Sequence, residues 1–397
     1  MVADGNITFA LRIKDLPGQA TMTETPEASE EGERKLRTSK ELAQLQVQGV
    51  LPYFNPAIYE MANPIVRSAL FALSKHKLYY QDWETTFSVG GGSLQQRGPS
   101  LNTDHEELWA RLLTYARGTS LTKGIHVRIV DLIRDLNYST GGPNFARVSR
   151  MLNDLEAASV RISHKPALKR LYELLTDKNL AKRADGKFLV ELIRNRYSEH
   201  LKAIQAALAS DSNEPVYVTL RFIERKTTHP ISGREVISLD PMTCLFFDGT
   251  NTTLIPYKVR EKLNPISKRL LTFIGSHRDG VYRMRLYFYF MLVGYKGDYT
   301  KLERKFKSEF IKTCNGLQER NYIKPGWGIE RNEDHEWMVF GLQIGDAARV
   351  KEAMEEYLAT GRDGSAQPEA DEADGEILDL IAETGELFDM DVPEAST

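Results

Sequence analysis

Two segments of the sequence place basic side chains together on one face of a predicted helix. The first covers residues 144–155, where apolar residues recur every three or four positions and predict a buried stripe. The second covers residues 300–319 and has the same period. Guanidinium and ammonium groups in such an array bind phosphate oxygens, and Arg and Asn side chains also bind base edges. Both segments are therefore candidates for helices that contact nucleic acid.

The side chains of each helix divide into a buried and an exposed set. On the first helix we predict burial of Phe145, Val148, Leu152 and Leu155, and exposure of Asn144, Arg147 and Arg150. On the second helix we predict a buried stripe of Leu302, Phe306, Phe310 and Leu317. The opposite face carries the candidate DNA-binding residues Lys301, Arg304, Lys305, Lys307 and Lys312. The hairpin that follows adds the candidates Lys324 and Arg331. One such helix also fits an ordinary solvated surface. Two, each between a Gly turn and a hairpin, favour recognition helices.

Motifs for catalysis are absent from the sequence. There is no G-x-x-x-x-G-K-[ST] phosphate loop and no H-E-x-x-H zinc motif, and the eight histidines are scattered. Cys244 and Cys314 lie in unrelated contexts, which argues against a disulfide framework or a zinc cluster. We expect no enzyme activity, no cofactor and no metal site.

The net charge of −3 hides a strong separation of charge along the chain. From residue 346 onward three basic residues stand against sixteen acidic ones, a net charge of −13, so residues 1–345 carry +10. Residues 257–331 alone hold seventeen Lys or Arg and seven acidic residues, again +10. A local surplus of this kind is typical of a phosphate-binding surface, although for a charge cluster alone a solvated basic face is the simpler explanation.

The elements around the two basic helices occur twice in the same order: a helix, a short strand with a second helix, a Gly turn, the basic helix and a β-hairpin. In the first copy these are residues 104–113, 125–135, the turn STGGP at 139–143, helix 144–155, and strands 216–223 and 235–239 joined at 229–233. In the second they are 259–276, 282–285, 286–293, 300–319, and strands 322–330 and 336–342. This order predicts an α+β protein with tandem winged-helix domains.

We divide the chain into four parts. Residues 1–62 are polar, expected to be disordered, and include a candidate partner-binding peptide. Residues 63–256 form winged-helix domain 1 with a helical insertion at about 164–210, residues 257–345 form winged-helix domain 2, and residues 346–397 form an acidic, disordered tail. A signal peptide and an apolar run of the roughly 18 residues that span a membrane are both missing, so we expect a cytoplasmic protein that does not bind membrane.

Four blocks of sequence resemble the TrfA family of plasmid replication initiators. They are NPIVRSALF at 63–71, ELWARLLTYAR at 107–117, IVDLIRDLNYSTGGPNFARVSRMLNDLEA at 129–157 and LNPISKRLLTFIGSHR at 263–278. The order of the blocks is that of the family, and the similarity covers about residues 63–339 apart from the insertion. The resemblance implies a protein that binds direct repeats, called iterons, in double-stranded origin DNA and melts the adjacent AT-rich DNA.

The resemblance also implies partners: the host helicase, the host initiator DnaA, and a second copy of the chain in a monomer–dimer equilibrium. Relatives carry a Q-L-x-L-F type peptide that binds the sliding clamp, and the corresponding residues here are Gln44, Leu45 and Val47. The terminal aromatic anchor of that peptide is missing, which weakens the expectation of clamp binding.

Two other functions are compatible with these patterns. A transcriptional regulator uses the same winged helices, and an interaction scaffold would use the basic segment to bind acidic proteins. Specific repeat binding that persists over random DNA across a salt series would separate an initiator from a scaffold.

Overall fold

The computed structural model describes residues 51, 57–74, 77–90, 92–117, 120–121, 124–177, 187–209, 215–228, 234–247, 251–295 and 297–350. Helices and strands alternate along these residues and form small separate sheets, so the observed fold mixes α and β as predicted. Among the helices in these ranges, none combines the length and the hydropathy needed to cross a membrane. The predicted N-terminal region up to residue 50 and the tail from residue 351 lie outside the described residues.

A first set of elements, here called the first unit, surrounds the first basic helix. Its helices are α3 (Thr103–Tyr115), α4 (Ile129–Asp135) and α5 (Gly142–Ala157), and its strands are β6 (Ile125–Val127), β9 (Arg225–Thr228) and β10 (Glu235–Ser238). The strands form an antiparallel sheet in the order β6-β10-β9. The α5 helix starts at the predicted glycine turn, with Pro143 in its first turn, where the missing N–H costs no hydrogen bond.

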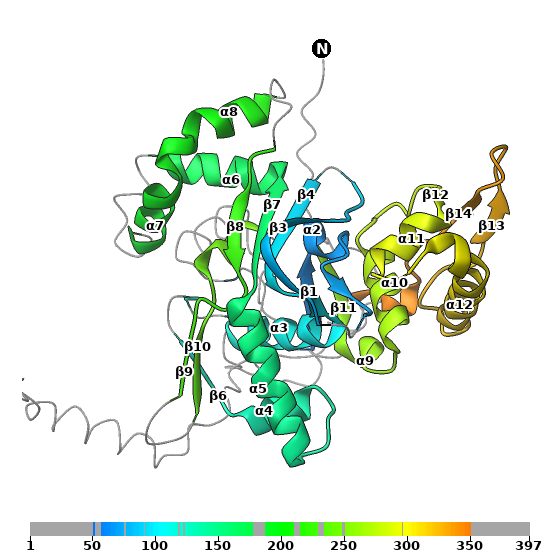
Figure 1. The fold of residues 1–397 in the computed structure, drawn as a ribbon, viewed down its shortest axis with the longest axis horizontal. Coiled ribbons are helices and arrows are strands. Elements are labelled where there is room, and N and C mark those ends of the chain that lie inside the picture. The colour runs from blue at the N-terminus through cyan, green and yellow to red at the C-terminus, as the bar shows by residue number, and fades with distance from the viewer. Residues whose placement is uncertain are drawn as a thin grey trace, which may run out of the picture.

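The second unit has the same order of elements and the same topology. It contains α10 (Pro265–Gly275), β12 (Met284–Arg285), α11 (Leu286–Leu292), α12 (Tyr299–Glu319), β13 (Gly328–Arg331) and β14 (Trp337–Phe340), followed by the short helix η4 (Asp346–Ala348). Its sheet order, β12-β14-β13, reproduces that of the first unit. Asp298 caps α12 by accepting a 3.0 Å hydrogen bond from the backbone N–H of Thr300. Figure 1 shows the two sheets at opposite ends of the molecule.

A four-stranded sheet lies beside the first unit. Its order is β3 (Tyr79–Thr86), β4 (Gly92–Pro99), β7 (Ser159–His164) and β8 (Val218–Arg221), and every neighbouring pair is antiparallel. Between β7 and β8 the chain forms α6 (Lys165–Thr176), α7 (Lys187–Tyr197), η2 (Ser198–His200) and α8 (Leu201–Ala209), which is the predicted helical insertion.

The hairpin predicted for the first unit is wrong, because its first strand belongs to another sheet. We expected residues 216–223 to pair with residues 235–239, but β8 pairs with β7, and β10 pairs instead with β9. The alternation of Val218 and Leu220 suits either sheet, because it specifies one buried face and no partner. The inserted helices determine which strand β8 pairs with, because they return the chain to a position next to β7.

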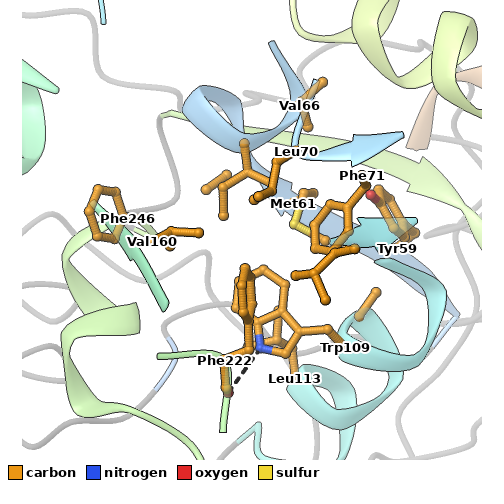
Figure 2. Packing of buried hydrophobic residues seen from close by; sticks show 14 of the residues in the cluster. Tyr59, Met61, Val66, Leu70, Phe71, Trp109, Leu113, Val160, Phe222 and Phe246 are labelled. Atoms are coloured by element: carbon orange, nitrogen blue, oxygen red, sulfur yellow. Dashed lines mark hydrogen bonds between the residues drawn. The ribbon is translucent and has the colours of Figure 1, made fainter. Parts of the chain in front are cut away.

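The buried apolar side chains of both units belong to one continuous cluster. At its centre in the first unit, the indole of Trp109 packs edge-on against Phe222 with ring centroids 4.9 Å apart, and its N–H donates to the Phe222 carbonyl at 3.3 Å (Figure 2). Phe71, from the parallel strand pair β2 (Phe71–Ala72) and β5 (Leu101–Asn102), lies 5.7 Å from Phe222. The units are therefore parts of one packed body.

A strand pair and two short helices carry the chain from one unit to the other. Strand β1 (Ile58–Ala62) precedes α2 (Asn63–Val66) and pairs antiparallel with β11 (Thr252–Pro256), which leads into α9 (Tyr257–Arg260) and then α10. The amide N–H of Tyr257 donates to the Ala57 carbonyl at 2.9 Å. Residues at the start of the described chain thus form part of the connection between the units.

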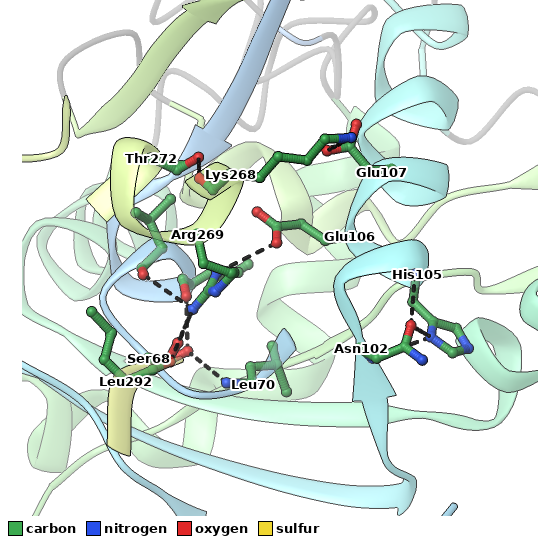
Figure 3. A network of polar contacts seen from close by, with 12 residues as sticks. Ser68, Leu70, Asn102, His105, Glu106, Glu107, Lys268, Arg269, Thr272 and Leu292 are labelled. Atoms are coloured by element: carbon green, nitrogen blue, oxygen red, sulfur yellow. Dashed lines mark hydrogen bonds and ion pairs between the residues drawn. The ribbon is translucent and has the colours of Figure 1, made fainter. Parts of the chain in front are cut away.

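Charged side chains are buried where the units meet. This group, here called the junction, consists of Tyr59 on β1, Glu106 and Glu107 on α3, Arg260 on α9 and Arg269 on α10. Arg269 donates to Glu106 at 3.4 Å and to the Ser68 carbonyl, and both charged side chains are only 1% exposed (Figure 3). Arg260 pairs with Glu107 and lies 3.6 Å over the ring of Tyr59, whose hydroxyl donates to Glu106.

The pKa shifts of Arg260 and Glu107 favour the ionised forms of this pair. Burial alone would lower the pKa of Arg260, but Glu107 and Tyr59 raise it above its ordinary value. Burial would likewise raise the pKa of Glu107, yet Arg260 and Lys268 hold it below the ordinary value. Removing one partner of a buried ion pair strongly destabilises the folded protein, because the remaining charge is left buried without compensation.

Replacing Arg269 by Met should lower the free energy of unfolding by up to about 3–5 kcal/mol, because Glu106 then stays buried without its ion pair to Arg269 and keeps only the 3.7 Å pair with Arg260. The double variant Glu106→Gln with Arg269→Met should recover part of that loss. Urea unfolding followed by circular dichroism measures both. Equal losses in the single and double variants would contradict an energetic coupling between the two residues.

Candidate nucleic-acid interface

The α5 helix is fixed by its apolar face and presents the other face to solvent. Val148, Met151, Leu152 and Leu155 are buried. Arg150 is exposed, and the part of the chain that the structure describes contains no ion pair to it. Arg150 is therefore the cation of this helix that is available to a ligand.

Asn144 and Arg147 are held by the protein itself. The Nη2 atom of Arg147 lies 2.6 Å from a carboxylate oxygen of Asp104, and its guanidinium stacks 4.4 Å from the ring centroid of Tyr138. Burial, and secondly Asp104, raise the pKa of Tyr138 to about 12, so its ring stays neutral. The amide of Asn144 donates to the Ser139 carbonyl at 2.8 Å. These contacts fix the start of α5 against α3 and the glycine turn.

The predicted burial of Phe145 is wrong, because its side chain is 38% exposed. With Met151 included in the buried face, the centre of that face rotates away from Phe145, and this shift could have been read from the sequence. The exposed side of α5 instead consists of Phe145, Ala146, Arg150 and Asn153, with Ser149 half-buried beside them. Amide, hydroxyl, guanidinium and apolar groups together match the donors, acceptors and thymine methyls of a major groove.

The α12 helix carries the larger basic surface. Phe306, Phe310, Cys314 and Leu317 anchor its buried face. The opposite side exposes Lys301, Arg304, Lys305 and Lys312, together with Ser308 and Asn315, which the charge pattern of the sequence does not reveal. Lys301 lies 4.0 Å from the capping Asp298 and is 82% exposed, so this contact leaves it accessible. The helix thus presents four cations and two neutral polar groups along one side.

Lys307 and Arg331 both contact the ring of Trp337, and Arg331 remains exposed to solvent. The ammonium of Lys307 lies 3.0 Å from the ring centroid and the guanidinium of Arg331 lies 4.6 Å from it. Burial, and secondly Arg331, lower the pKa of Lys307. Cation–π contacts of this kind contribute about 0.5–1 kcal/mol at exposed sites. They fasten α12 to the β13–β14 hairpin and so set the angle between them.

The two hairpins differ in charge. The β9 strand of the first unit exposes Arg225, with Lys226 half-buried next to it. The turn between β13 and β14 exposes Glu333 and Asp334, so Arg331 stands beside acidic side chains. Phosphate contacts therefore suit the first hairpin better than the tip of the second. Lys324, half-buried, lies before β13 and its backbone N–H donates to the Gln343 carbonyl at 2.9 Å.

The remaining candidate residues concern partners and ligands. Gln44, Leu45 and Val47 lie outside the described residues. Within the described ranges, no group of three or more His, Cys, Asp or Glu is arranged to hold a metal ion. Burial raises the pKa of the Cys244 thiol to about 12, which fits a packing role.

Comparison with known proteins finds a matching family model and a similar protein of known function. Residues 28–181 match the family model described as TrfA protein. The chain is also 19% identical over 338 residues to the plasmid replication initiator protein TrfA of Escherichia coli, with 82% of this chain and 74% of that protein aligned. The predicted resemblance to the TrfA family is confirmed.

Two solved structures are similar over much of the chain. Domains 2–3 of RctB share 13% identity at a TM-score of 0.40, covering 75% of this chain and 99% of that one. A selenomethionine derivative of domains 2 and 3 of RctB shares 14% identity at a TM-score of 0.38, covering 70% and 95% respectively.

The blocks that carry the TrfA resemblance include many residues at the junction and its surroundings. From NPIVRSALF, Arg67 donates to the Ser276 hydroxyl at 3.0 Å and Asn63 accepts from the Thr253 hydroxyl at 2.7 Å. Arg269, from the block at 263–278, reaches back to the Ser68 carbonyl. The residues that make these contacts are separated by about two hundred positions in the sequence. Their chemistry is therefore largely that of joining the two units.

The contacts of α5 separate two arginines that look alike in sequence. Replacing Arg150 by Ala should reduce the preference for a cognate over a scrambled duplex by about 1–3 kcal/mol, because its exposed guanidinium can bind base edges. Replacing Arg147 by Ala should instead lower the melting temperature, because it removes the ion pair with Asp104. Fluorescence anisotropy and thermal unfolding measure the two effects. A loss of preference in Arg147→Ala with no loss of stability would contradict this assignment.

Proposed function

We propose that this chain is a plasmid replication initiator that binds direct repeats in double-stranded origin DNA through two winged-helix domains. The observation that carries the proposal is the repeated topology: two units with the same element order and sheet order each expose a polar or basic helix. The TrfA relationship supports it, because the curated relative is named as a plasmid replication initiator. The proposed domains correspond to residues 63–256 and 257–345.

In this proposal α5 and α12 each enter a major groove. On α5, Arg150 and Asn153 contact base edges, since both are exposed and their groups suit guanine and adenine respectively. On α12, Lys305 and Lys312 contact phosphates and supply most of the salt-dependent affinity. The junction keeps the two helices at a fixed separation, so both engage one repeat without a further loss of conformational freedom.

Later steps are proposed from the TrfA relationship. The bound protein opens the adjacent AT-rich DNA and recruits the host helicase with the initiator DnaA, and a monomer–dimer equilibrium controls the binding form. The initiator acts in the cytoplasm and has no catalytic site or cofactor of its own. Clamp binding through residues 44–48 would lack a main apolar contact, because this peptide has no terminal aromatic side chain.

Binding of the full chain to a duplex with direct repeats from its own replicon tests the proposal. We expect affinity for the repeats to exceed that for a scrambled duplex by about a thousandfold or more, and to fall steeply with salt. Replacing Lys305 or Lys312 by Gln should weaken binding to both duplexes alike and reduce the salt slope by about one.

Lys202→Gln is the matched control, because Lys202 is exposed on α8, in the insertion and away from both helices. It should leave both affinities unchanged. Equal and weak binding of the wild type to the two duplexes would overturn the proposal and favour an interaction scaffold. Repeat-specific binding only at a promoter, without replication of a plasmid that depends on the repeats, would favour a transcriptional regulator.

A further inference from the structure

The exposed side of α12 is strongly basic over about 17 Å, the rise of eleven helical residues. This side, here called the cationic face, consists of Lys301, Arg304, Lys305 and Lys312. Lys301 has a 4.0 Å contact with Asp298, and the other three cations form no ion pair with any residue that the structure describes. Like charges three and four positions apart on a helix repel each other, so an anionic ligand here would relieve that repulsion.

The carboxylates of α12 itself lie outside the cationic face. Glu309 is half-buried and accepts a hydrogen bond from the Tyr295 hydroxyl at 3.3 Å. Glu303 is also half-buried and interacts with Lys307, on the side of the helix that contacts Trp337. The cationic face is therefore open to an anion from elsewhere.

The described chain ends beside the C-terminus of this same helix. The backbone N–H of Gly345 donates to the Tyr322 carbonyl at 2.8 Å, and that of Ala347 donates to the Asn321 carbonyl at 3.3 Å. A Cβ added at Gly345 would collide with the Asn321 carbonyl, so the close approach requires glycine. The segment that leads into residue 351 is thus held against the two residues that follow Arg320, the C-cap of α12.

The sequence that follows is strongly acidic. Residues 351–397 contain fifteen acidic and two basic side chains, a net charge of −13, so residues 1–350 carry −3 + 13 = +10. Within this segment residues 369–379, here called the acidic run, contain six acidic side chains and no basic one.

The acidic run is close enough in sequence to reach the cationic face. Asn321 and Lys301 are separated by about 30 Å along the helix axis. The eighteen residues 351–368 can span up to about 60 Å, since an extended chain covers roughly 3.3 Å per residue. Both the charge and the length of the intervening chain therefore suit a contact within one molecule.

We propose that the acidic run binds the cationic face of α12 and competes there with DNA phosphates. Ammonium and guanidinium groups bind carboxylates through the same charge-assisted hydrogen bonds that they make to phosphate. Tethering gives the acidic run an effective concentration on the order of 1 mM, so even a weak contact is populated. The competition rests on the proposed DNA binding by α12, whereas the contact itself needs no DNA.

The contact would affect the two DNA-binding helices unequally. The acidic run covers the phosphate-binding cations of α12 and leaves Arg150 on α5 accessible. It should therefore lower the affinity for every duplex by the same factor and leave the preference for the repeats unchanged. Because salt screens the attraction between the two charged segments, the inhibition should be strongest at low ionic strength.

Carbodiimide crosslinking of the full chain without DNA, followed by mass spectrometry, tests the contact. We expect carboxylates of the acidic run to crosslink to Lys301, Lys305 and Lys312 within one molecule, and excess repeat duplex to suppress these crosslinks. Lys202, exposed on α8, is the internal control and should crosslink to the acidic run far less.

Three results would overturn the proposal: crosslinks that reach Lys202 as often as the cationic face, crosslinks that join two copies of the chain instead of one, or crosslinks that persist while the duplex is bound. If the chain binds no repeat duplex, the crosslinks without DNA still report on the contact, so failure of the proposed function is seen separately.

Neutralising the acidic run in the full chain tests the competition. The variant carries Glu369→Gln, Asp371→Asn, Glu372→Gln, Asp374→Asn, Glu376→Gln and Asp379→Asn. With an effective concentration of about 1 mM and a contact Kd of about 0.1 mM, affinity for repeat and scrambled duplexes should each rise about tenfold at low salt.

The same neutralisation in two further backgrounds separates a contact from general repulsion of DNA by the acidic segment. With Lys305→Gln and Lys312→Gln, the rise should fall below about threefold, because the acidic run has lost half of its cationic partners. With Lys202→Gln it should remain about tenfold. An equal rise in all backgrounds, or no rise in the wild type, would overturn the proposal.

Discussion

The buried ion pairs at the junction are the constraint on which the rest of this structure depends. Glu106 and Arg269 are each almost completely removed from water, and the cost of dehydrating them is offset only in the relative placement that brings them together. A small rotation of α10 against α3 would separate the charges without rehydrating them. The pairs therefore contribute less to net stability than to the choice of one arrangement of the two units.

This constraint explains why two of the TrfA-like blocks, at 63–71 and 263–278, lie where the units meet. Arg67, Arg269 and Ser276 join segments that are distant in sequence, and their partners include backbone carbonyls as well as carboxylates. The continuous apolar cluster supplies the driving force, and the polar contacts select the geometry. The helices that would contact DNA can then vary their exposed residues without disturbing the joint. A rigid joint also explains how α5 and α12 would act on one repeat together.

Sequence patterns could predict the elements but only part of their partners. The second unit follows directly from the period of α12 and from the cap at Asp298, since both signals are local. The pairing of β8 could not be predicted, because its alternation suits two sheets and the choice depends on the inserted helices. The ion pair of Arg147 could not be predicted either, since its partner Asp104 lies 43 residues earlier. Burial of the junction charges depends on contacts of the same long range.

The most direct test of the account is guanine methylation interference on a duplex that contains a single repeat, with the full chain bound. If the junction holds both helices for simultaneous binding, interference should appear as two clusters at a fixed spacing, each in a major groove. The spacing should be the same in every repeat of the origin. A single cluster, or a second cluster whose position varies between repeats, would contradict a rigid pair of DNA-binding units.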